Sequence, residues 1–394
     1  MNAVLFSERE VQAFVRENDV KFIRLAFCDL FGTQKNISIL PAALGDALEE
    51  GVRVDAASIP GFGGLGIPDL FLVPDAATAA LLPWRPSHGR VARFYCALRT
   101  AQGTPFAGDV RALLQETLRE ADAAGFTFDV GAECGFCLFK TDENGRGTAE
   151  PFDEAGYMDI APRDKGENIR REICLTLEEM GITPESSHHE RGPGQNEICF
   201  ARSGPLASAD NVTTFKSVVR TIAARGGAEA RFEPKPLPGP YCNDFHINFS
   251  FSAPRGRTEY GAFLAGLLEH LGALTLFLNP TEESYARLEA GGSARAAWSR
   301  TDRAALVRVP QTRDGQPARI EARSPDCCSN PYLAYTLLLR AGLDGLRRGL
   351  TPPEPDTAGL VLPASLAEAR ERAEESAFVA AALPQPVLRA YMEA

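Results

Sequence analysis

Two glutamates lie on either side of a glycine–proline–glycine turn, next to a pair of histidines. The run reads His188-His189-Glu190-Arg191-Gly192-Pro193-Gly194-Gln195-Asn196-Glu197. Because this composition is typical of a chain reversal, Glu190 is expected to end one strand and Glu197 to begin the next, with both carboxylates facing one cleft. Hard divalent cations prefer carboxylate oxygens, and such cations also hold phosphate. Two glutamates alone are more often surface acids on a hairpin, and only the whole run points to a metal site.

A second run, Arg319-Ile320-Glu321-Ala322-Arg323, places two arginines and a glutamate at alternate positions. Alternate residues of a strand share a face, so these three side chains are expected to lie together. Arginine binds carboxylates and phosphates through paired donors and stays charged at any working pH. We interpret the other nearby arginines Arg313, Arg347 and Arg348 as solvated surface charges.

These runs belong to a series of motifs that resembles the glutamine synthetase family. From the N-terminus onward the matching segments are Phe27–Gly32, Asp55–Ile59, Gly61–Gly64, Asp69, Leu72–Asp75, Ala132–Phe139, His188–Glu197, Phe232–Pro236, Asn279–Thr281, Ser284–Leu288, Arg319–Asp326 and Asn330–Leu333. No single segment is decisive, but so many in one order identify the chain as a member of that family. The resemblance implies an ATP-dependent enzyme that uses Mg²⁺ or Mn²⁺.

The resemblance also implies two metal sites. Glu133, His246 and Glu321 would hold one ion against the phosphates of ATP. Glu190, Glu197 and a further glutamate would hold the other, but that glutamate would fall at Gly135 and is missing. Taken alone, His246 is more typical of a buried, hydrogen-bonded strand histidine, and the glutamates at matching positions favour a ligand instead.

Further roles follow from the resemblance. Asp55 would bind and deprotonate the incoming amine across a subunit contact, since the family's sites lie between neighbours in a ring. The residues assigned in this way are Asp55, Arg303 and Arg323 as catalytic, Arg308, Arg319, Asn248 and Ser250 as ATP-binding, and Arg287, Tyr241, Asn243 and Gly135 as substrate-binding.

The departures from the family pattern are clustered. Tyr241–His246 replaces a glycine-rich loop that lets the backbone approach the amino-acid substrate. The glutamate missing at Gly135 would also have faced that substrate, and the catalytic flap is shortened to Gly291–Arg295, with Glu289 nearby but without an assigned role. Because phosphate-handling residues are kept while amino-acid recognition is changed, we expect a different acid, a different amine, or both.

Composition limits the class of protein. The formal net charge of −11 argues against a nucleic-acid partner, because phosphate backbones need clustered lysine and arginine. We find neither an apolar run long enough to cross a membrane nor an N-terminal signal, so a cytoplasmic protein without a membrane partner is expected. The nine scattered cysteines lack paired zinc spacing and are expected to be reduced.

The pattern of elements predicts an α+β protein with two domains. Residues 1–104 would form a small β-grasp-like domain, with strands at Val20–Phe27 and Val91–Leu98 and a loop at Pro60–Pro68. Residues 105–394 would form the catalytic domain, an antiparallel sheet with flanking helices. The predicted helices are Val110–Ala124, Asn168–Met180, Asp210–Ala224, Gly261–Leu278, Pro331–Arg348 and Ala364–Ala381, and the predicted strands are Thr127–Phe139, Glu197–Ala201, Ala230–Phe232, Phe245–Phe251 and Arg319–Arg323.

The predicted function is an ATP-dependent ligase that joins a carboxylate, glutamate-like or not, to an amine through an acyl phosphate, with glutamine not its main product. One alternative is a non-catalytic scaffold or regulatory protein, although such a protein would not need Glu133, His246, Glu321, Arg319 and Arg323. Another is a kinase-like protein that passes an acyl phosphate to a partner. We expect a homo-oligomer, most simply a single ring, with a double ring as the alternative.

Overall fold

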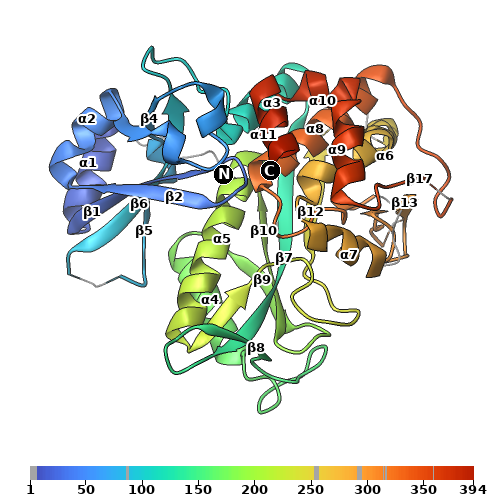
Figure 1. Cartoon of the computed structure of the whole chain (residues 1–394), viewed down its shortest axis with the longest axis horizontal. Coiled ribbons are helices and arrows are strands. Elements are labelled where there is room, and N and C mark those ends of the chain that lie inside the picture. Colours follow the sequence, from blue (N-terminus) through green and yellow to red (C-terminus); the bar gives the residue numbers. More distant parts are fainter. Residues whose placement is uncertain are drawn as a thin grey trace. The chain divides into compact units, whose positions relative to one another are not determined.

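The computed structural model (Figure 1) describes residues 7–85, 88–252, 257–290, 295–313, 315, 317–357 and 359–394. The chain forms two compact units. The first comprises Met1–Leu113, Glu179–Gly181 and Pro384–Ala394, and the second comprises Leu114–Glu178 and Ile182–Leu383. The last helix therefore belongs to the first unit, whereas the sequence analysis placed it with the catalytic domain; the domain limits at 104/105 stay a prediction.

The first unit is built on a six-stranded sheet of order β2-β1-β6-β4-β3, with β5 also paired to β6. Its strands are β1 (Val20–Cys28), β2 (Gln34–Ile39), β3 (Val52–Asp55), β4 (Asp69–Pro74), β5 (Ala80–Leu81) and β6 (Arg90–Arg99), and its helices are α1 (Glu8–Glu17), α2 (Leu44–Glu49) and α11 (Gln385–Glu393). Strands β1 and β6 run parallel, and the other pairs are antiparallel. The expected β-grasp-like domain is confirmed.

Short 3-10 turns complete this unit. They are η1 (Pro41–Ala43), η2 (Ala56–Ser58), η3 (Gly63–Leu65) and η4 (Ala76–Thr78). The predicted Pro60–Pro68 loop thus contains one helical turn. Helix α11 contacts the β1–β2 region, because the Tyr391 hydroxyl donates to the Leu30 carbonyl at 3.1 Å and its ring lies 5.3 Å from that of Phe31.

The second unit is built on a nine-stranded sheet of order β14-β15-β16-β12-β7-β10-β9, with β8 and β11 also paired to β7. Its strands are β7 (Thr127–Thr141), β8 (Gly147–Pro151), β9 (Pro184–His189), β10 (Gln195–Ser203), β11 (Ala228–Arg231), β12 (Phe245–Ser252), β14 (Trp298–Ser299), β15 (Val307–Arg308) and β16 (Ile320–Ala322), and a separate pair is formed by β13 (Arg295–Ala296) and β17 (Leu360–Val361). The expected antiparallel sheet is confirmed except for the parallel pair β14–β15.

The helices are α3 (Val110–Ala123), α4 (Glu167–Glu179), α5 (Pro205–Arg225), α6 (Arg257–Leu278), α7 (Glu282–Ala290), α8 (Pro331–Arg348), α9 (Leu366–Glu374) and α10 (Ala377–Ala382). The single helix predicted over Ala364–Ala381 is wrong, because Ser376 caps a new helix by accepting a hydrogen bond from the Val379 amide. Asp109 caps α3 as predicted, since it accepts from the Arg111 and Ala112 amides.

Helix α6 corrects one expectation from the sequence. Its segment Glu259–Leu278 is long and apolar enough to cross a membrane, with a hydropathy of 1.6. However, 78% of that window is buried within the structure. Helix α8 lies against it so closely that a Cβ on Gly266 would come 2.2 Å from the Ala341 carbonyl oxygen. This is the packing of a core helix.

Strict alternation along the central strands separates a core face from a polar face. On β12, Phe245, Ile247 and Phe249 are fully buried. Phe249 packs on Phe263 of α6 at 5.9 Å and on Tyr335 of α8 at 6.4 Å. The residues between them on β12 therefore project from the opposite face of the sheet. That face carries the site described next.

Candidate active site

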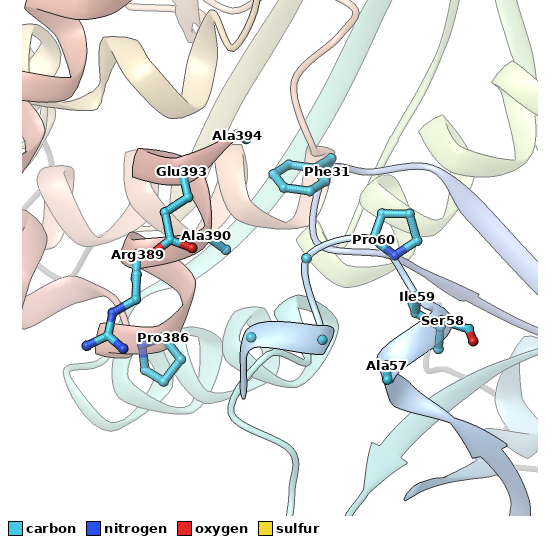
Figure 2. A pocket seen from close by; sticks show the side chains of 13 residues that line it. Phe31, Ala57, Ser58, Ile59, Pro60, Pro386, Arg389, Ala390, Glu393 and Ala394 are labelled. Atoms are coloured by element: carbon cyan, nitrogen blue, oxygen red, sulfur yellow. The ribbon is translucent and has the colours of Figure 1, made fainter. Parts of the chain in front are cut away.

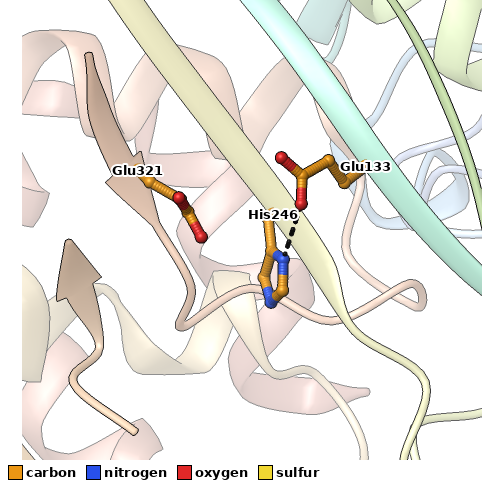
Figure 3. Close-up of side chains that lie close together, drawn as sticks. All are labelled: Glu133, His246 and Glu321. Atoms are coloured by element: carbon orange, nitrogen blue, oxygen red, sulfur yellow. Dashed lines mark hydrogen bonds and ion pairs between the residues drawn. The ribbon is translucent and has the colours of Figure 1, made fainter. Parts of the chain in front are cut away.

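Strand register brings the predicted metal ligands together. His246 on β12 lies opposite Glu133 on β7, and Asn248 lies opposite Glu321 on β16. Because positions two apart on a strand share a face, these side chains meet above three adjacent strands (Figure 3). One possible ligand atom from each of Glu133, His246 and Glu321 lies within 4.8 Å of the others.

Glu133 is held as a carboxylate by its neighbours. Its Oε2 lies 3.2 Å from His246 Nδ1, and its Oε1 accepts from Asn248 Nδ2 at 2.9 Å. Burial alone would raise the pKa of Glu133, but these contacts and the charge of Arg319 lower it to about 2. Burial would likewise lower the pKa of His246, yet the carboxylates of Glu133 and Asp244 raise it.

Glu321 is the centre of an arginine cluster. It is 1% exposed and lies 2.6 Å from Arg323, 3.1 Å from Arg308 and 3.2 Å from Arg319. Burial lowers the pKa of Arg308, and the charges of Arg323, Arg303 and Arg319 lower it further, although Glu321 opposes them. Several guanidinium groups around one carboxylate leave an excess of positive charge, which suits the oxygens of a phosphoryl group.

A second acidic group lies on β10 and at the end of β9. His188 Nε2 is 2.9 Å from Glu190 Oε1 and 4.0 Å from Glu197 Oε1. Burial raises the pKa of Glu197, and the charges of Glu133 and Glu190 add to this effect. A carboxylate that resists ionisation near other carboxylates is stabilised by a bound cation. Gly135, where the family's further glutamate would stand, is paired with Glu197.

Both groups fit divalent cations by the chemistry of their donors. The first offers two carboxylates and an imidazole, and the second offers Glu190, Glu197 and the imidazole of His188. Oxygen-rich sets that leave positions open for phosphate and water are typical of Mg²⁺ sites. The residues present therefore fit the metals that the sequence implied, although Gly135 leaves the second set without the expected third glutamate.

The turn between Glu190 and Glu197 is supported from within the protein. Asp153 Oδ1 accepts from the Gly194 amide at 3.0 Å and lies 2.9 Å from His189 Nε2, while His189 Nδ1 lies 2.7 Å from the Glu190 carbonyl oxygen. Burial alone would raise the pKa of Asp153, but His189 lowers it to about 2. A Cβ on Gly194 would meet the Leu138 carbonyl at 2.4 Å, so only glycine fits this position.

Two of the predicted substrate-binding residues, Arg287 and Asn243, are buried and hydrogen-bonded to other protein groups. Arg287 is 5% exposed, and its Nη1 donates to Asp244 Oδ1 at 2.7 Å. The Asn243 side chain is fully buried and donates to the Glu233 carbonyl at 2.9 Å. Its contacts are therefore structural and do not support a substrate role. Tyr241 packs over the glycine-rich turn, where its Cβ would lie 2.8 Å from a Cβ on Gly192.

Two predicted nucleotide-binding residues lie on the polar face of β12. Asn248 Oδ1 accepts from Arg319 Nε at 2.7 Å, so Asn248 links Arg319 to Glu133. Ser250 accepts from Arg202 Nη1 at 2.9 Å. Arg303 is exposed at the arginine cluster. The predicted flap residues 291–294 lie outside the described residues.

Asp55 lies in the first unit, as the exposed last residue of β3. Its Oδ2 accepts from the Ser58 hydroxyl at 2.5 Å, and this contact lowers the pKa of Asp55. The residues that follow it line one side of a cavity of about 500 Å³, and α11 lines the other side (Figure 2). The lining includes Ala57, Ser58, Pro60, Arg389 and Glu393.

Three residues at this face were missed by the sequence analysis. Asp244 pairs with Arg287, Arg202 reaches Ser250, and Asp153 holds the turn. Asp244 stood inside a segment recognised as divergent, so its acidic side chain was a usable signal. Nothing in the local sequence indicates the partners of Arg202 or Asp153, which lie 48 and 36 or more positions away.

We expect Glu321→Gln to reduce ATP turnover at least about a hundredfold, because a lost ligand at a metal–phosphate site removes several kcal/mol of charge stabilisation. Glutamine keeps the shape of the side chain, whereas alanine would leave three arginines around a void and would also destabilise the fold. Mn²⁺ titration should show weaker binding in the variant. Glu143→Gln, in an exposed turn, serves as the control. Unchanged ATP turnover in Glu321→Gln would refute the ligand assignment.

Asp153→Asn tests the support of the turn. Since the folded pKa of Asp153 is below its unfolded value, its contribution is present above about pH 4 and is lost as the pH falls through about 2. We expect the variant to lower the free energy of unfolding by about 2 kcal/mol at pH 7, and by less at pH 3. Denaturant unfolding at both pH values measures this, with Asp122→Asn on exposed α3 surface as the control. An equal loss at both pH values would contradict the electrostatic account.

Comparison with known proteins places the chain in a family. Residues 19–101 match the family profile "Glutamine synthetase, beta-Grasp domain", and residues 107–394 match "Glutamine synthetase, catalytic domain". The chain is 44% identical over 362 residues to a glutamine synthetase of Clostridium saccharobutylicum, covering 88% of this chain and 82% of the relative. It is 40% identical over 414 residues to a glutamine synthetase of Methanosarcina mazei, covering 98% and 92%.

A solved structure agrees with these matches. The structure described as "GmaS/ADP complex-Conformation 1" superposes with a TM-score of 0.86 at 26% identity, covering 97% of this chain and 94% of that one. The chain therefore belongs to the glutamine synthetase family of ATP-dependent ligases, which form carbon–nitrogen bonds with the help of Mg²⁺ or Mn²⁺.

Proposed function

We propose that this chain is an ATP-dependent ligase that joins an acid other than glutamate to an amine, through an acyl phosphate. The family acts on small-molecule substrates, so the acid and the amine are both small molecules. The names of the relatives do not decide the substrate, because the residues that depart from the family lie at the predicted amino-acid site. The proposal therefore rests on this chain's own side chains.

The observation that carries the proposal is the contrast between the two sides of the polar face. On one side Glu133, His246, Glu321 and their arginines form a connected set suited to metal and phosphate. On the other side Gly135 has no side chain, and a Cβ there would lie 3.3 Å from the Asp244 amide nitrogen. The Tyr241–Asp244 loop thus occupies the space beside Gly135 that an acidic side chain would need.

In the proposed reaction, a carboxylate oxygen of the acid attacks the terminal phosphorus of ATP and ADP leaves. The amine nitrogen then attacks the acyl carbon, phosphate leaves, and the nitrogen loses a proton. Bound ATP and divalent cations supply the phosphoryl group and offset its charge. Arg308, Arg319 and Arg323 provide fixed positive charge where negative charge develops. Asp55, whose pKa is lowered by its contact with Ser58, is a carboxylate at neutral pH and is the proposed acceptor of the amine proton.

The substrate proposal predicts that glutamate with ammonia is a poor pair. We expect its kcat/KM to be about tenfold or more below that of the best acid in a panel, because a lost charged contact is worth about 1.5–3 kcal/mol. The measurement is ADP and phosphate release from ATP across acids and amines. Gly135→Glu is not expected to restore glutamate use, since its Cβ would press on the Asp244 backbone. If glutamate and ammonia proved the best pair, the proposal would fall.

We further propose that the working form is an oligomeric ring with active sites shared between neighbours. Members of the family are generally oligomeric. The exposed position of Asp55 and the Gly- and Pro-rich loop that follows it support a role at a contact between copies. A site built from two subunits would need Asp55 of one and the metal ligands of the next.

A mixing experiment tests the shared site. Asp55→Ala and Glu321→Gln are each expected to be inactive alone. If they are co-expressed and assemble at random, about a quarter of the sites should combine both intact residues and regain activity. Native mass measurement at several concentrations gives the ring size. Absence of any regained activity in confirmed mixed oligomers, or an active monomer, would contradict the shared site.

A further inference from the structure

We propose that Asp244 selects the acid substrate, and that this acid carries a cationic group, such as an ammonium, and no second carboxylate at the end remote from the reacting carboxylate. The inference rests on the proposed function, because it names the class of acid that the ligase takes. It is carried by the pairing of Asp244 with Arg287 inside the site.

Arg287 is already occupied as a carboxylate receptor. Its Nη1 donates to Asp244 Oδ1 at 2.7 Å, and its Nη2 donates to Asn279 Oδ1 at 3.0 Å and to the Ser324 carbonyl oxygen. Arginine recognises a carboxylate best with two parallel N–H groups. Both terminal nitrogens of Arg287 are engaged by the protein, and its Nε has no partner but is buried away from solvent, so no such pair faces an incoming carboxylate. Asp244 takes the place that a substrate carboxylate would need.

Asp244 itself still has accepting capacity toward the site. Its side chain is 39% exposed, and its Oδ2 lies 3.9 Å from His246 Nε2, beyond hydrogen-bonding distance. Its main chain is fixed, because its carbonyl oxygen accepts from the Gly135 amide at 2.9 Å and from the Cys327 thiol at 3.2 Å. A fixed carboxylate with a spare oxygen next to the metal and phosphate residues favours a cation and repels a second carboxylate.

Gly135, next to Asp244, also favours an ammonium group over a second carboxylate. A side chain at Gly135 would lie 3.3 Å from the Asp244 amide nitrogen and 3.6 Å from the Asn243 Cα. A glutamate at Gly135 would therefore be tightly packed against the present loop, which would have to shift by a few tenths of an ångström to admit it. Where the family has a glutamate at position 135, this chain has its negative charge on Asp244 instead. That charge is paired with Arg287. Recognition of an ammonium group is kept by this exchange, and recognition of a carboxylate is lost.

Four acids separate the two effects. Glutamate, 4-aminobutyrate, glutarate and butyrate share the reacting carboxylate, and the third carbon beyond it bears an ammonium and a carboxylate, an ammonium only, a carboxylate only, or neither. With ATP, Mg²⁺ and hydroxylamine as the amine, we expect kcat/KM to be highest for 4-aminobutyrate. Glutamate and glutarate should be lower by about tenfold or more. ADP release is the measurement, and thermal stabilisation by each acid gives an independent order of binding.

Asp244→Asn and Asp244→Gly test the residue directly. Asp244→Gly frees Arg287 Nη1, whereas Asp244→Asn removes the negative charge but keeps an oxygen that can accept from Nη1. Glutarate and glutamate should therefore gain relative to 4-aminobutyrate by about tenfold in the glycine variant, mainly through KM, and by less in the asparagine variant. If a variant is poorly folded because Arg287 is left unpaired, glutarate should stabilise it against heat more than it stabilises the parent. Asp122→Asn, on exposed surface of α3, should leave the order of the four acids unchanged.

The outcomes are distinguishable. Glutarate or glutamate used by the parent as well as 4-aminobutyrate overturns the inference while the ligase proposal stands on its other substrates. An equal loss for all four acids in both variants gives Asp244 a purely structural role and also overturns it. Absence of ADP release with every acid counts against the proposed function, and the thermal order of the four acids then decides the inference by itself.

Discussion

The register of β16, β12, β7 and β10 is the constraint on which the site depends. Hydrogen bonds set His246 opposite Glu133, Asn248 opposite Glu321 and Gly135 opposite Glu197. A slip of one residue in any of these strands would send its charged side chains into the apolar core and its aromatic side chains into solvent. The buried aromatic face, packed on α6 and α8, therefore fixes the polar face as well. The same alternation of side chains along the strands therefore determines both the core packing and the geometry of the site.

This arrangement concentrates charge that the protein alone balances only in part. Glu321 has three arginine partners, whereas the pKa of Glu197 is raised by burial and by the carboxylates near it. One end of the face thus has surplus positive charge and the other has surplus negative charge. Phosphate oxygens would balance the surplus positive charge, and divalent cations would balance the surplus negative charge. A metal–nucleotide complex therefore complements both ends at once.

The sequence predicted those parts of the structure that depend on local pattern. The family motifs grouped Glu133, His246 and Glu321 as one ligand set, period-two alternation put Arg319, Glu321 and Arg323 on one face, and the helix limits at Pro331–Arg348 were correct. Features that depend on tertiary neighbours were missed. One such feature is the pair of hydrogen bonds from the Asn243 amide to the Arg231 and Glu233 carbonyl groups, and the substrate role of Asn243 stays a prediction. The helix over Ala364–Ala381 was taken as continuous, because a cap at Ser376 competes only weakly with an alanine-rich pattern.

The two departures from the family at the substrate side, Gly135 and Asp244, are physically linked and are not independent losses. Gly135 without a side chain permits the Asp244 backbone to approach, and that approach is fixed by the hydrogen bond from the Gly135 amide to the Asp244 carbonyl. Asp244 then forms an ion pair with the buried Arg287, whose charge also acts on the buried carboxyl group of Asp326. Reversing Gly135 alone would crowd the Asp244 backbone, and reversing Asp244 alone would remove the acidic partner of Arg287. Selection for a different substrate explains such a matched pair more directly than decay, since decay has no reason to keep a buried arginine neutralised.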